Sequence, residues 1–209
     1  FMNEYMPYDL VLHAAASQPY HTYCTVWDSK YPEDVKRFAT HGCSRLYPHV
    51  NGTAPVFPME YIESMNADLQ DQGYIVQVDT VEELADKLGF TGDAKETFLA
   101  TVERYNALYD AQEDTDFGKP AYRLSAIRKA PFYGCWLGAS LLTTEQGIAI
   151  NEKGQALDND NKPMPGLYIT GDMSGSFFAN NYPCLMAGVS MGRTLTFAMK
   201  AVKQMAGLE

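Results

Sequence analysis

The sequence predicts a fold of mixed helices and strands, an α+β region followed by a shorter α/β region at the carboxyl end. Apolar side chains recur every three or four residues over 94–112, which indicates an amphipathic helix. The runs at 132–142 and 166–170 are apolar without helical spacing, so they predict buried strands. A second helical pattern follows Pro183 and closes at Gly207.

The amino-terminal region shows few regular patterns. Residues 1–60 are rich in Tyr, Pro and His, and they predict an irregular segment with one strand over 23–27. Capping boxes at 80–83 and 93–96 predict the first turns of two helices, because a hydroxyl or carboxylate followed three residues later by Glu satisfies free amides. The shorter of these helices is expected to end at Gly89.

Composition narrows the class of ligand. The chain has 209 residues, of which 46% are hydrophobic, and this is ample for a core. A formal net charge of -10, with only 16 scattered Lys and Arg residues, argues against a nucleic-acid partner. No stretch approaches the roughly 18 uninterrupted apolar residues of a membrane span. We therefore expect a soluble protein that binds a small organic molecule.

Cysteine and histidine spacing predicts no metal site. The four cysteines form no CxxC pair, and the four histidines lie in the first quarter of the chain with no HxxxH pair. The cysteines are expected to be buried free thiols. No signal-like segment follows Phe1, and localisation stays open between the cytoplasm and export.

The stretch "GLYITGDMSGSFFANNYP" at 166–183 combines two small-residue turns, one acid and several aromatics. A buried strand that ends in Gly171 and Asp172 suits a nucleotide cofactor, because glycine lets the backbone come close and the carboxylate accepts hydrogen bonds from sugar hydroxyls. Amides at the helix start near 186–188 would stabilise negative charge on such a ligand. The alternative is a structural aspartate that caps the turn.

Four ordered segments resemble one family. They are "FMNE" at the start, "TVERYNALYDAQEDTDFGKP", "APFYGCWLGASLLTTEQGIAIN" and "PGLYITGD...ANNYPCLMAG...GRTLTFA". Together they are similar to the fumarate reductase and succinate dehydrogenase flavoprotein superfamily, especially its soluble flavocytochrome c and 3-ketosteroid dehydrogenase-like branches. The resemblance implies a capping domain over 1–141, incomplete at its amino end, and the carboxyl-terminal segment of a Rossmann-like FAD-binding domain over 142–209.

The resemblance also implies FAD as the cofactor. Asp172 would hold ribityl or ribose hydroxyls, and Gly171 and Ser174 would let the backbone approach. The helix-terminal amides would face the pyrimidine side of the flavin; they belong to Leu185, Met186, Ala187 and Gly188. The family's GxGxxG phosphate-binding turn is absent from this sequence. It would lie in a preceding part of a longer protein or in another polypeptide.

The sequence departs from the family at three substrate positions. Tyr8 and Tyr182 stand where fumarate reductases have arginines, and 142–144 reads Leu-Thr-Thr where they have a histidine. Fumarate is therefore not the expected substrate, since a phenol is a neutral donor that suits a ketone or enone. Both tyrosines are catalytic candidates, with packing aromatics as the alternative. Arg193, which follows Gly192 as in the family, is expected to be structural.

The resulting hypothesis is a part of an FAD-dependent oxidoreductase. It would transfer a hydride between flavin N5 and an activated C=C bond, with a tyrosine completing the proton transfer. One alternative is a 3-ketosteroid-type dehydrogenase that runs the oxidation. Another is a non-catalytic capping module that needs a partner chain for FAD. The electron donor or acceptor and the direction of the reaction stay open.

Overall fold

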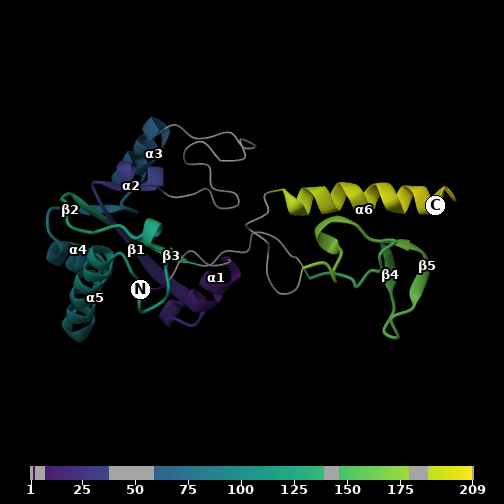
Figure 1. The fold of residues 1–209 in the computed structure, drawn as a ribbon, viewed down its shortest axis with the longest axis horizontal. Helices are drawn as coiled ribbons and strands as arrows, with labels where there is room; N and C mark the ends of the chain where they lie inside the picture. Colours follow the sequence, from purple (N-terminus) through teal and green to yellow (C-terminus); the bar gives the residue numbers. More distant parts are fainter. Residues whose placement is uncertain (1, 3–7, 38–58, 139–145, 179–187, 209) are drawn as a thin grey trace. The chain divides into compact units, whose positions relative to one another are not determined.

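The computed structural model describes residues 2, 8–37, 59–138, 146–178 and 188–208. Contacts divide the chain into a first unit that takes in Val11–Ala139 and a second that takes in Ser140–Glu209. In Figure 1 the first unit runs from purple to teal and the second from green to yellow. Each unit is described by itself. Their assignment as a capping domain and an FAD-domain segment stays a prediction.

An antiparallel sheet forms the centre of the first unit. It contains β1 (Thr22–Asp28), β3 (Phe132–Gly138) and β2 (Val76–Val78), in the order β1-β3-β2. β1 and β3 pair along their full length, from Thr22 opposite Gly138 to Asp28 opposite Phe132. The strands predicted at 23–27 and from 132 are confirmed. The end of the second prediction, 139–142, lies outside the described residues.

The core of this unit lies between the sheet and α4 (Val81–Lys87). Its buried centre consists of Leu84, Leu88 and Phe132. Alternate residues of a strand point to the same face, so Cys24 and Val26 of β1 both pack against this centre. One face of the sheet is thereby covered.

The two helices expected after residue 79 are present, with one correction. Thr80 caps α4, because its hydroxyl accepts a hydrogen bond from the Glu83 N–H at 3.1 Å. Helix α5 spans Gly92–Ala111. The capping role expected at 93 is wrong, since Thr91 is the N-cap and Asp93 lies inside the first turn. An acid there still interacts favourably with the positive helix end.

The prediction that residues 1–60 are irregular is wrong for the described part. The segment forms α1 (Tyr8–Ala16), a short 3-10 turn η1 (Pro19–His21) and α2 (Tyr31–Arg37), and α3 (Met59–Asp71) begins just before residue 60. Helices as short as α1 and α2, with 9 and 7 residues, span too few turns to give a clear periodic signal. In α2 the proline occupies the first turn, where no hydrogen-bonded N–H is needed.

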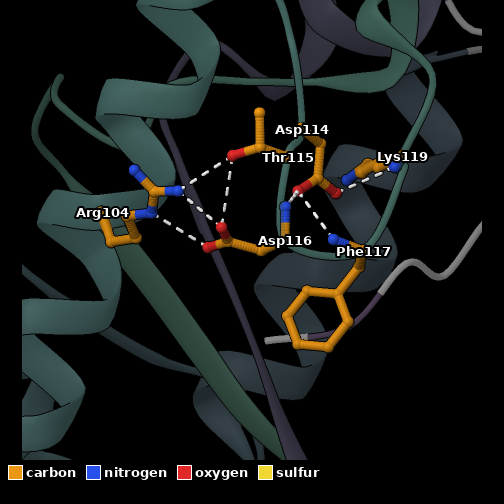
Figure 2. Close-up of polar contacts among 6 residues, drawn as sticks. All are labelled: Arg104, Asp114, Thr115, Asp116, Phe117 and Lys119. Carbon is orange, nitrogen blue, oxygen red and sulfur yellow. Dashed lines mark hydrogen bonds and ion pairs between the residues drawn. The ribbon is translucent and has the colours of Figure 1, made fainter.

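The loop after α5 folds around a buried carboxylate (Figure 2). Asp114 is 6% exposed and accepts backbone hydrogen bonds from Asp116 and Phe117, both at 3.0 Å, and from Lys119 at 2.9 Å. Burial alone would raise the pKa of Asp114, but these amides outweigh it and hold the pKa below its ordinary value. Arg104 of α5 binds the same loop, since its Nε donates to Asp116 at 2.9 Å.

The second unit is a β-hairpin with a helix along it (Figure 1). The hairpin pairs β4 (Gln155–Leu157) with β5 (Pro163–Tyr168). A 3-10 turn, η3 (Gly171–Met173), follows β5, and α6 (Val189–Met205) ends the unit. The core consists of Ile150, Ala156 and Ile169 under Phe197 of α6.

The predicted order of strand, Gly-Asp turn and helix is confirmed, but the burial of the strand is not. β5 begins at Pro163, three residues earlier than expected, and most of it is exposed. The physical reason is that β5 pairs only with β4 among the described residues. Residues 183–187 of the predicted helix lie outside the description. No described helix is both long and apolar enough to cross a membrane.

Candidate functional site

The candidate site is the turn of residues 171–174, here called the Gly-Asp turn. Gly171 has a φ of +71°, a left-handed conformation that glycine adopts without strain. Its carbonyl accepts hydrogen bonds from the Ser174 N–H at 3.0 Å and from the Ser174 hydroxyl at 2.7 Å. Ser174 is only 1% exposed. Its side chain therefore closes the turn from within, and the exposed residues of the turn are Asp172 and Met173.

Residues 147–148, here called the Ile148 segment, hold the Gly-Asp turn from one side. The Ile148 N–H donates to the Met173 carbonyl at 3.0 Å, and the Gly175 N–H donates to the Ile148 carbonyl at 2.8 Å. The two backbones are so close that a Cβ on Gly147 would clash with the Met173 carbonyl. A Cβ on Gly175 would clash with the Gly147 carbonyl. Glycine is required at both positions for this approach.

One face of α6 packs against the other side of the turn. Ser190, Arg193 and Thr194 lie three and four residues apart, so they share this face. Arg193 has a side chain only 1% exposed, and its Nη1 and Nη2 donate to the carbonyls of Ser174 and Gly171. Helix α6 therefore fixes the backbone of the turn through a buried guanidinium.

Asp172 is anchored and still open to solvent. Its Oδ1 accepts a hydrogen bond from the Ser190 hydroxyl at 3.3 Å and lies 3.7 Å from Nη2 of Arg193. The side chain is nevertheless 52% exposed. An oriented, half-exposed carboxylate can accept hydrogen bonds from the hydroxyls of a ligand. The residues present therefore fit a cofactor that carries sugar or ribityl hydroxyls.

The amino end of α6 adds a positive partial charge to the same unit. Gly188 is its N-cap, with φ of +80° and no side chain to bond the first amides. The amides of a first helical turn have no partner within the helix. They and the helix dipole favour negative charge on a ligand. This end could hold the electron-rich part of a cofactor.

The predicted site residues fall into three groups. The structure brings Gly171, Asp172 and Ser174 together in one turn, with Gly188 at the start of the helix that packs on it. Four others lie outside the described residues, namely Tyr182, Leu185, Met186 and Ala187. Tyr8 is the first residue of α1, and its side chain is not described.

Sequence reasoning missed Ser190 and Thr194 and did not connect Arg193 to the Gly-Asp turn. Their spacing is a usable signal, because three polar residues at helical spacing on the inner face of a carboxyl-terminal helix need polar partners. Two small-residue turns precede these residues in the sequence, the Gly-Asp turn and Gly175-Ser176. The sequence does not show which carbonyls those partners are.

The described thiols lie outside this site. Cys24 and Cys135 are free and half-buried in β1 and β3, whereas full burial was expected. Burial, with a smaller effect of Cys135, raises the pKa of Cys24 to about 11. The nucleophilic form of cysteine is the thiolate, so a raised pKa keeps this thiol unreactive at neutral pH. Cys43 and Cys184 lie outside the described residues.

The first unit contains a cavity of about 320 Å³ lined by residues of β1, α2, α3, α5 and 119–127. Two of its charged residues, Asp28 and Lys119, are engaged with the protein itself. Asp28 accepts three backbone hydrogen bonds, each at 2.9 Å. Lys119 donates to the Tyr105 hydroxyl at 2.7 Å. These groups tie loops to β1 and α5, so the Gly-Asp turn is the better candidate site.

A family model described as an FAD binding domain matches residues 1–185. The chain belongs to this FAD-binding family. Its cofactor is FAD, and the resemblance to fumarate reductase and succinate dehydrogenase-like flavoproteins is confirmed. The half-exposed carboxylate of the Gly-Asp turn therefore belongs to a member of a flavoprotein family.

Curated relatives of this FAD-binding chain are oxidoreductases by name. NADH:acrylate oxidoreductase of Vibrio harveyi is 36% identical over 110 residues, which cover 53% of this chain and 11% of that protein. 3-Oxosteroid 1-dehydrogenase of Mycolicibacterium smegmatis is 31% identical over 151 residues, covering 65% of this chain and 26% of that protein. The chain thus spans only a small part of the relatives it matches.

A solved structure shows the same fold. The 3-ketosteroid Δ1-dehydrogenase of Sterolibacterium denitrificans, in complex with 1,4-androstadiene-3,17-dione, matches with a TM-score of 0.73. The match covers 100% of this chain and 37% of that chain at 23% identity. At this identity the likeness shows the fold alone, which is the mixed helix and strand fold of an FAD-binding flavoenzyme.

Proposed function

We propose that the chain forms part of an FAD-dependent oxidoreductase that transfers a hydride between flavin N5 and an activated C=C bond of an organic substrate. The observation that carries this proposal is the anchored, half-exposed carboxylate of Asp172 in the Gly-Asp turn. Within an FAD-binding family, such a group has a direct use. It accepts hydrogen bonds from the ribityl or ribose hydroxyls of FAD.

Other groups of the second unit would complete the contact with the cofactor. Gly171, which is partly exposed and has no side chain, would let FAD approach the turn, and the buried Ser174 would support the turn from within. The amide of Gly188 at the start of α6, with those of 185–187, which lie outside the described residues, would face the pyrimidine side of the flavin and stabilise negative charge. FAD supplies the hydride chemistry, and these groups bind and orient it.

Tyr182 and Tyr8 are proposed to act on the substrate. A phenol is a neutral donor, so Tyr182 polarises a ketone or enone oxygen and Tyr8 assists the proton transfer. This choice of donor disfavours a small dicarboxylate such as fumarate. The name of the acrylate oxidoreductase relative supports reduction of an activated C=C bond.

The alternative is a 3-ketosteroid-type dehydrogenase that runs the oxidation. The observations that favour it are the steroid dehydrogenase relative and the solved structure with the same fold. A tyrosine that donates to a carbonyl serves either direction. Assays of the complete protein with a 3-ketosteroid plus an electron acceptor, and with an enone plus a reduced dye, separate the two.

We also propose that the first unit is the capping lid and the second unit the closing segment of the FAD domain. The remainder of the FAD domain, in the same or another polypeptide, would pack on the outer face of α6. This face is apolar and exposed, with Met191 65%, Leu195 59%, Met199 65%, Val202 61% and Met205 61% accessible. Such a contiguous apolar stripe is typical of a contact surface.

The test is Asp172→Ala in the complete protein. Hydrogen bonds to a charged group are worth about 1.5–3 kcal/mol, so FAD affinity should fall by roughly 10- to 100-fold. Asp160→Ala is the matched control, because Asp160 lies in the hairpin loop of the same unit with a side chain 77% exposed. Flavin content per protein and the Kd for FAD are measured. An unchanged flavin content in Asp172→Ala contradicts the proposal.

A further inference from the structure

The guanidinium of Arg193 lies in a place where a charge is costly. Its side chain is 1% exposed in the inner face of α6, and its buried Nε has no hydrogen-bond partner among the described residues. Removing a charge from water is unfavourable unless the protein provides compensating contacts. An apolar side chain would fill this helix face at a lower cost. The charge therefore needs a reason other than packing.

Among the described residues, the compensating contacts of Arg193 converge on the Gly-Asp turn and the residues that follow it. Nη1 lies 3.5 Å from the Ser174 carbonyl, and Nη2 donates to the Gly171 carbonyl and lies 3.7 Å from Oδ1 of Asp172. The guanidinium also stands over the ring of Phe178 at 4.9 Å and over that of Phe177 at 5.3 Å. One side chain thus contacts both ends of the turn and its exposed carboxylate.

We infer that Arg193 is a positioning residue that preorganises the Gly-Asp turn and the Asp172 carboxylate for FAD. This inference rests on the proposed function of the turn. Arg193 is fully covered, so it acts through the turn. It fixes two carbonyls, which sets the direction of the intervening backbone, and it holds Oδ1 of Asp172 while the side chain stays half exposed.

The expected effect follows from preorganisation. Without Arg193, the turn keeps the hydrogen bonds from Ser174 and from the Ile148 segment, but Asp172 keeps only Ser190 of the two α6 groups that hold its Oδ1. The side chain and the backbone around it would then be ordered at the moment of binding. This ordering weakens affinity. The loss appears in the Kd for FAD, with the turn still formed.

The experiment compares Arg193→Met and Arg193→Lys with Lys200→Met in the complete protein. Lys200 is a matched control, because it lies on α6, donates to the Glu152 carbonyl at 2.8 Å and stands over the Phe197 ring at 6.0 Å, away from the turn. We expect Arg193→Met to weaken FAD binding at least tenfold. Arg193→Lys should fall between it and wild type, because an ammonium has one nitrogen where the guanidinium places two on different carbonyls. Lys200→Met should stay within twofold.

A double-mutant cycle with Asp172→Ala separates positioning from general destabilisation. If Arg193 acts through Asp172 and its turn, the two losses of FAD affinity are not multiplicative. The double variant then binds FAD at least fivefold more tightly than the product of the two single losses predicts. Multiplicative losses overturn the inference, because a structural role elsewhere would not be coupled. If Arg193→Met does not fold, the same cycle is run with Arg193→Lys.

The inference and the proposed function fail in different ways. If Asp172→Ala weakens FAD binding and neither Arg193 variant does, the turn binds FAD but Arg193 does not position it. If Asp172→Ala leaves the Kd unchanged, the proposed role of the turn is wrong, and the positioning role falls with it. The visible circular dichroism of bound flavin gives a second readout. It should change in Arg193→Lys and stay the same in Lys200→Met.

Discussion

A phenol and a guanidinium recognise different oxygen groups, and this difference determines what Tyr182 can bind. A guanidinium binds a carboxylate through two parallel charged hydrogen bonds. A phenol offers one neutral donor, which suits a carbonyl whose oxygen becomes negative as the reaction proceeds. The neighbouring Phe177 and Phe178 pack edge to face at 5.0 Å, so two aromatic rings lie a few residues before position 182 in the sequence. These features favour a ketone or enone.

We expect Tyr182→Phe to lower turnover about a hundredfold while FAD stays bound. The substitution removes only the hydroxyl, and one donor to a developing oxyanion is worth roughly 2 to 4 kcal/mol. Turnover of an enone substrate and the flavin spectrum of the complete protein are the measurements. Tyr74→Phe is the control, because Tyr74 lies in the first unit and is 67% exposed. Full activity of Tyr182→Phe, or efficient fumarate reduction by wild type, contradicts the substrate proposal.

Helix α6 shows how one element serves two surfaces. Ser190, Arg193 and Thr194 face the Gly-Asp turn, and Phe197 continues the same face into the core of the hairpin. The opposite face is apolar and exposed. An amphipathic helix of an isolated domain normally exposes polar residues. The pattern of α6 is that of a helix covered on both faces, which supports the proposed contact with the remainder of the FAD domain.

The contact between the Ile148 segment and the Gly-Asp turn depends on small residues, and this gives a test. We expect Gly175→Ala to destabilise the protein by about 1–3 kcal/mol and to lower its flavin content, because the added methyl overlaps the Gly147 carbonyl. Gly192→Ala in α6 is the control, since a Cβ there meets open space. Alanine favours helix over glycine by roughly 0.5–1 kcal/mol. The measurement is the midpoint of thermal unfolding of wild type and of both variants. If the Gly175→Ala midpoint equals that of Gly192→Ala, the turn tolerates the added methyl and the prediction is wrong.

The contacts proposed for FAD on this chain make up one half of a cofactor site. They are the Gly-Asp turn for sugar hydroxyls and the α6 amino end for the flavin, whereas the sequence has no GxGxxG turn for the adenine dinucleotide phosphates. Ligand binding must overcome the loss of translational and rotational freedom of FAD. Half of the contacts leave little surplus after that loss.

We therefore expect the 209-residue chain alone to hold no FAD after desalting and to show no turnover. The absorbance spectrum of the purified chain with added FAD, and a reductase assay with a reduced dye as donor, are the measurements. Adding the polypeptide that contains the phosphate-binding turn should restore both. Activity of the chain alone would contradict this expectation.

Local signals determined much of this description. The capped start of α4, the long helix α5, the strands β1 and β3 and the order of β5, Gly-Asp turn and α6 were all predictable, because caps, periodicity and turn residues act within a few positions of the chain. The cofactor followed from ordered motifs, and the family match bears it out. The roles of Tyr8, Tyr182 and 185–187 stay predictions.

Only the tertiary structure showed what holds the candidate site. Arg193 meets the carbonyl of Gly171 across 22 positions of sequence, and Gly147 meets Met173 across a comparable gap. Neither contact has a local signature, since a helix pattern shows that a face is buried but not what it is buried against. The exposure of β5 was likewise hidden, because its apolar sequence is the same whether or not a neighbour covers it. Packing between distant segments decides which side chains are buried, and here it buries the Arg193 guanidinium behind the Gly-Asp turn.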